Sequence, residues 1–155
     1  MELKDLKKEY SDLAEKYKLP SFKELNENFE IEKIDKDTEI LLRDVRKVMM
    51  EKIVNSLGFL EMFLNPMNAP RMYLAYMKNM GSEERQSIEK IYGLFAGLNV
   101  IALEGEIDYS EKKEVEIIKE IFKAWITAKP DFMKLFAAMK KPNGETIRKE
   151  RSYFG

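Results

Sequence analysis

The chain has 155 residues, of which 45% are hydrophobic and 35% are charged, so it is long and apolar enough to bury the core of one folded domain. Lysine and arginine total 27 against 28 aspartates and glutamates, which excludes a net charge that would draw the whole molecule to nucleic acid or an anionic membrane. The lack of cysteine and histidine excludes disulfides, thiolate sites, the usual general base and His-containing zinc or di-iron sites.

The N-terminal part is expected to contain two helices. Apolar residues recur at spacings of three and four over residues 2–18, which predicts an amphipathic helix that Pro20 closes. Ser21 and Glu24 form a Ser-x-x-Glu capping box, the signature of a helix start, so a short second helix should follow. The charged stretch 30–37 is predicted to be a linker.

The longest predicted helix runs from Asp37 to Leu64, because only Gly58 interrupts a continuous apolar face there. Residues 65–70 contain two prolines and two asparagines and predict a turn. A short, methionine-rich helical segment should come after the turn. Another long helix is expected over residues 82–103.

Two glycines stand out in the helix expected over residues 82–103. Gly93 and Gly97 are four residues apart and therefore lie on one side of that helix. Small residues at this spacing allow another helix to approach closely.

The C-terminal third is expected to hold two helices separated by a proline. The segment 104–108 is predicted to be a loop, and Asp108 with Glu111 forms a second capping box that begins a helix. Pro130 is expected to end that helix, because proline lacks the backbone donor that a helix interior requires. Asp131 should then cap a last helix.

Together these elements predict an all-α fold, a single-domain bundle of about six to seven helices. Residues 1–141 should form the helical domain, and residues 142–155 a polar, basic C-terminal tail. The helices near 37–64, 82–103 and 110–128 are expected to form the main packing layer, because each carries a wide apolar stripe that has to be buried against another helix.

The first candidate site is a methionine-rich segment. Seven of the ten methionines lie between positions 49 and 80. Methionine is flexible and polarisable, so such a segment can form an adaptable surface for a partner helix, or it can fill an irregular core. The leading hypothesis is a non-catalytic interaction or adaptor module, binding a protein partner or a second copy of itself. Its predicted contact residues are Met67, Met72, Tyr73, Tyr76 and Met77.

The second candidate site is the basic, aromatic tail. Basic residues beside aromatic ones can hold a nucleic-acid backbone while the rings stack on bases, or they can dock a peptide. The alternative is a solvated chain end. The residues that would carry nucleic-acid or peptide binding are Arg148, Lys149, Arg151, Tyr153 and Phe154.

The third candidate is the acidic segment 104–111, which suggests a cation-dependent regulator or enzyme. Its glycine, isoleucine and closing glutamate resemble the second half of an EF-hand calcium loop. Val100 and Ala102 occupy the positions where such a loop has its first two carboxylates. A glycine stop followed by the Asp108 capping box explains the same residues without a cation.

No catalytic motif is present in the sequence. It contains no recognisable pairing of a nucleophile with a base, no paired-carboxylate pocket and no glycine-rich phosphate loop, so neither an enzyme activity nor a cofactor or metal site is predicted. The first residues are charged, and no apolar run approaches the roughly 18 residues that a membrane helix needs. A cytoplasmic protein without a membrane partner is therefore expected.

Overall fold

The computed structural model describes residues 2–141, and six α helices account for most of them. No strand occurs in this part of the chain. The all-α fold is therefore confirmed. The helices are α1 (Leu3–Tyr17), α2 (Phe22–Phe29), α3 (Leu41–Leu64), α4 (Arg71–Lys78), α5 (Ser82–Ile107) and α6 (Glu111–Lys140), and two short 3₁₀ helices, Ile31–Lys33 and Pro66–Asn68, follow α2 and α3.

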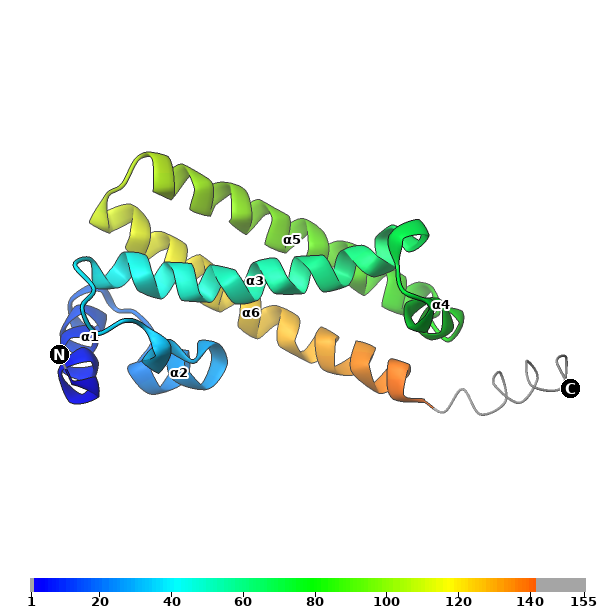
Figure 1. Ribbon diagram of the computed structural model, residues 1–155, viewed down its shortest axis with the longest axis horizontal. Helices are drawn as coiled ribbons and strands as arrows, with labels where there is room; N and C mark the ends of the chain where they lie inside the picture. The colour runs from blue at the N-terminus through cyan, green and yellow to red at the C-terminus, as the bar shows by residue number, and fades with distance from the viewer. Residues whose placement is uncertain (1, 142–155) are drawn as a thin grey trace, which may run out of the picture.

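Helices α3, α5 and α6 form the main layer, as expected, and each packs against the other two (Figure 1). The short helices α1 and α2 lie together near the N-terminal end of α3, whereas α4 lies at its C-terminal end (Figure 1). Among residues 2–141, no helix combines the length and apolar character needed to cross a bilayer.

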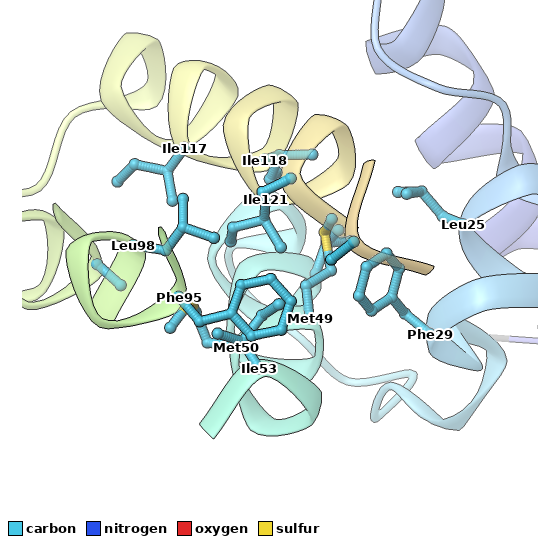
Figure 2. Packing of buried hydrophobic residues seen from close by; sticks show 14 of the residues in the cluster. Leu25, Phe29, Met49, Met50, Ile53, Phe95, Leu98, Ile117, Ile118 and Ile121 are labelled. Atoms are coloured by element: carbon cyan, nitrogen blue, oxygen red, sulfur yellow. The ribbon is translucent and has the colours of Figure 1, made fainter. Parts of the chain in front are cut away.

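The core lies where the three long helices meet and where α2 closes one side (Figure 2). Side chains from four helices point into it, and burying them removes apolar surface from water, which is the main stabilising contribution to such a fold. The buried residues labelled in Figure 2 are Leu25, Phe29, Met49, Met50, Ile53, Phe95, Leu98, Ile117, Ile118 and Ile121.

The capping box predicted at the start of α2 is confirmed. The Ser21 hydroxyl accepts a hydrogen bond of 3.1 Å from the Glu24 backbone N–H, and the Glu24 carboxylate accepts one of 2.8 Å from the Ser21 N–H. Helix α3, in contrast, starts four residues later than expected. Ile40 is its N-cap, and the hydroxyl of Thr38, which precedes the helix, donates to the carboxylate of Asp44 in its first turn.

The prediction of a loop over residues 104–108 is wrong, because α5 continues to Ile107. Gly105 does not stop the helix. It lies where α5 contacts α6, and an added Cβ would come within 2.9 Å of the Ile117 Cδ1 atom. The capping residue of α6 is also different from the one expected. The Ser110 hydroxyl accepts the N–H of Lys113 at 3.1 Å, whereas the Asp108 carboxylate pairs with the Lys113 ammonium at 2.5 Å.

Pro130 does not end a helix, so Asp131 caps none. Both residues lie inside α6, which continues to Lys140. Pro130 is exposed, so water can satisfy the carbonyl one turn earlier that loses its backbone partner. Ala128 and Phe132, on either side of it, are buried in the core and hold both halves of the helix against the bundle.

Replacing Pro130 with alanine should stabilise the protein. The substitution restores a backbone hydrogen bond and removes the proline ring from a helix interior, which should raise the free energy of unfolding by about 1–2 kcal/mol after allowing for the more flexible unfolded chain. Urea denaturation followed by circular dichroism measures this change. A lower free energy of unfolding would show that the proline is needed for the packing of α6.

Candidate interaction surfaces

An aromatic cluster fixes α4 to the end of α3. The rings of Phe63 and Tyr73 have centroids 5.4 Å apart, and those of Phe59 and Tyr73 are 6.1 Å apart, both in edge-to-face geometry. Tyr76 packs edge-on against Tyr73 at 6.1 Å. Both tyrosines are half-buried. These two predicted contact residues therefore position α4, with only part of each ring facing solvent.

The methionines of the predicted segment are divided between core and surface. Met49, Met50 and Met80 are buried, and Met77 is half-buried against the core. In contrast, Met67 is 93% exposed and Met72 is 59% exposed. Leucines are exposed on the same part of the chain. We call the exposed set, Leu64, Met67, Met72 and Leu74, the Met-rich end.

A hollow of about 260 Å³ adjoins the Met-rich end. It lies between the end of α3, α4 and the start of α5, and Leu64 contributes to both the hollow and the Met-rich end. Met77 and Met80 line it together with Arg85 and Glu89, so its walls combine apolar side chains with one charge of each sign. A partner at the Met-rich end could therefore insert an apolar side chain next to polar groups.

A second apolar surface lies on the side of α5 that faces away from α3. Leu94 and Val100 are exposed there, and Gly93 and Gly97 leave the backbone uncovered. We call these four residues the α5 outer face. It borders a groove of about 510 Å³ between α5 and α6.

The acidic segment near residue 108 is part of a buried ion-pair network. Arg46 of α3 is 3% exposed and donates from Nε to Glu114 of α6, which is fully buried, over 2.6 Å. Its Nη2 donates to Glu106 of α5, also over 2.6 Å. One guanidinium thus joins the three long helices. Arg46 was not among the predicted site residues, although the sequence offered a signal for it, a charged residue within the apolar face of the longest helix.

The network shifts the pKa values of Arg46 and Glu106. Burial opposes the charged form of Arg46, but the hydrogen bonds with Glu114 and Glu106 outweigh this effect and raise its pKa. The same hydrogen bond from Arg46 lowers the pKa of Glu106. The second carboxylate oxygen of Glu114, Oε1, is buried without a hydrogen-bond partner among the described residues. The Arg46 contacts therefore have to offset most of the desolvation cost of Glu114.

Basic side chains pair with two acidic groups of the expected cation loop. Glu106 pairs with Arg46, and Asp108 pairs with Lys113. The Arg43 guanidinium lies 4.9 Å from the centre of the Tyr109 ring, beside the same turn. Between residues 2 and 141, no group of three or more acidic side chains is placed so that it could hold a metal ion.

The residues predicted to bind nucleic acid or peptide lie outside the part of the chain that the structure describes. They are Arg148, Lys149, Arg151, Tyr153 and Phe154.

Comparison with known proteins identifies no relative: no family model, no curated protein and no solved structure matches the chain. Its function is therefore inferred from its own residues and their surroundings.

Removing one partner of the buried ion pair should lower the free energy of unfolding far more than removing both partners. Arg46→Met leaves the Glu114 carboxylate buried without its cation, which should cost about 3–5 kcal/mol of folding free energy. The double variant Arg46→Met with Glu114→Leu should recover most of that loss, because apolar side chains of similar size replace both charges. Urea unfolding of the four proteins in this cycle measures the coupling. A double variant as unstable as Arg46→Met would contradict this account.

Acid should destabilise the fold partly through Glu106. Because its pKa is lowered in the folded state, Glu106 contributes stability above its unfolded pKa, about 4.3, and loses that contribution as the pH falls through its folded pKa. Glu106→Gln should therefore lose less stability than the wild type between about pH 5.5 and 3. Hydrogen bonds also lower the pKa values of Glu24, Glu30 and Asp108. The variant keeps these three residues, so their contributions are the same in both proteins. Equal losses in the two proteins would contradict the assigned role of Glu106.

Proposed function

We propose that this chain is a non-catalytic interaction module that binds another protein through its Met-rich end. One observation carries the proposal: Met67 and Met72 are exposed, whereas Met49, Met50 and Met80 are buried in the core. Single exposed apolar residues are common on proteins, but several on one short stretch of chain favour a binding surface. Leu64 and Leu74 extend the exposed apolar set.

The surroundings of the Met-rich end support this proposal. The ring of Tyr73 packs against that of Phe63 and holds α4 on α3. Little order therefore has to be gained when a partner binds. Methionine side chains adapt to the shape of an apolar partner. The adjoining hollow, with Arg85 and Glu89 in its wall, adds polar groups that can orient a partner segment.

The buried ionisable groups also favour a module without catalysis. Arg46 and Glu114 pair with each other across two helices, and this pairing accounts for their burial without a catalytic role. Perturbed ionisable groups mark active sites only when they face a pocket that a substrate can reach. Neither residue lines the hollow beside the Met-rich end or the groove beside α5.

Site-specific photo-crosslinking tests the proposed function. A photoreactive amino acid is placed at Met72, and a matched control places it at Met133 of α6, which is exposed to nearly the same extent, 58% against 59%. In an extract of the source cells, position 72 should give a discrete adduct with another protein and position 133 should not. Met67→Asp should suppress the adduct at position 72 by about tenfold or more, because a charge is costly in an apolar contact.

Two results would contradict the proposed function. One is labelling of the same proteins from positions 72 and 133, which would indicate random collisions. The other is an adduct that persists unchanged in the Met67→Asp variant. Circular dichroism of each variant checks that the helices are retained, so a lost adduct is not mistaken for unfolding.

A further inference from the structure

Helix α5 is apolar on the side that the fold leaves uncovered. Its inner side buries Ile91, Phe95 and Leu98 against α3 and α6. Its outer side nevertheless exposes Val100 by 57% and Leu94 by 42%. A helix at the surface of a globular protein is normally polar on its solvent side, whereas a helix that is apolar all round is normally buried all round. The α5 outer face therefore requires a cover that one copy of this chain does not provide within residues 2–141.

The shape of the surface beside α5 suits another helix. The groove of about 510 Å³ runs between the α5 residues Gly93 and Gly97 and the α6 residues Ala124 and Thr127. A Cβ atom at either glycine would meet nothing within 4 Å, so neither glycine is needed for contacts inside one copy. Without side chains at these two positions, a second helix can approach the α5 backbone closely.

We propose that a second copy of this chain covers the α5 outer face, with its own α5 running antiparallel across Gly97. Such a contact is isologous, because each copy offers the same surface to the other, and it closes at a dimer. In this arrangement, residues at equal distances on either side of Gly97 face each other. Leu94 of one copy faces Val100 of the other, and Gly93 leaves room for Ile101 of the second copy.

Charge complementarity favours a second copy as the partner and an antiparallel direction of its α5. Lys90 and Glu104 are both exposed, and they lie seven residues before and after Gly97, hence two turns away on the same side of α5. An antiparallel pair sets Lys90 of each copy against Glu104 of the other, twice. A parallel pair would instead set like charges together, which is unfavourable. Among the described residues, neither Lys90 nor Glu104 forms an ion pair, so both are available.

The proposed dimer uses a surface different from the Met-rich end, so the two proposals can fail separately. A dimer formed through α5 leaves Met67 and Met72, at the opposite end of α3 from α1, free for another protein. The net charge of −1 per chain adds little repulsion between two copies.

The mass of the full chain in solution tests the dimer. Light scattering coupled to size-exclusion chromatography at about 100 µM, well above the Kd of a specific interface of standard size, should give the mass of a dimer. Gly97→Glu should give a monomer with unchanged helix content, because the new side chain is exposed in one copy but blocks the close contact between two. Gly58→Glu is the matched control, since Gly58 is also a helical glycine whose Cβ would meet nothing within 4 Å. It should remain a dimer.

Charge reversal tests the antiparallel direction. Lys90→Glu and Glu104→Lys should each weaken dimerisation about tenfold, because each places like charges opposite one another at both ends of the contact. The double variant should regain wild-type affinity, because the charges again alternate. Four outcomes would overturn the inference: a monomeric wild type, a dimer that survives Gly97→Glu, a dimer lost equally in Gly58→Glu, or a double variant no tighter than the single ones. Dimer loss in Met67→Asp would assign self-association to the Met-rich end instead.

Discussion

The buried guanidinium of Arg46 determines how the three long helices are placed. Its two hydrogen bonds of 2.6 Å reach Glu114 on α6 and Glu106 on α5, and the first of these carboxylates is fully buried. Apolar packing alone tolerates small shifts of one helix along another, because many side chains can repack. A buried charge does not tolerate them, since the loss of its partner leaves an uncompensated ion. The network therefore restricts the rotation and the register of α5 relative to α3 and α6.

This placement determines which apolar residues remain exposed. Once Phe95 and the other inner residues of α5 face the core, Val100 has to face outward. At the far end of α3, the aromatic contacts around Tyr73 place α4 so that Met72 faces solvent. The two apolar surfaces thus follow from one arrangement of helices. We assign them different occupants: a second copy on α5, and another protein at the Met-rich end.

Local signals in the sequence predicted the helices, because periodicity and the Ser21 capping box depend on residues a few positions apart. The errors come from contacts between distant residues. Gly105 stays helical because it packs against α6, and Pro130 is tolerated because both of its sides are held by the core. The partners of Arg46 are 60 and 68 residues away, beyond any local pattern. Likewise, methionine-rich composition could not show that Met80 is buried and Met67 is exposed.

Carbene footprinting of the full chain at increasing protein concentration distinguishes the two assigned surfaces, because this method reports where solvent is lost on each of them. The α5 and Met-rich surfaces are then compared in one experiment. We expect labelling of Leu94 and Val100 to fall as the concentration rises, while labelling of Met67 and Met72 stays constant. Protection of the two methionines with unchanged labelling of α5 would contradict the account, because it would place self-association at the Met-rich end and leave the outer face of α5 without a cover.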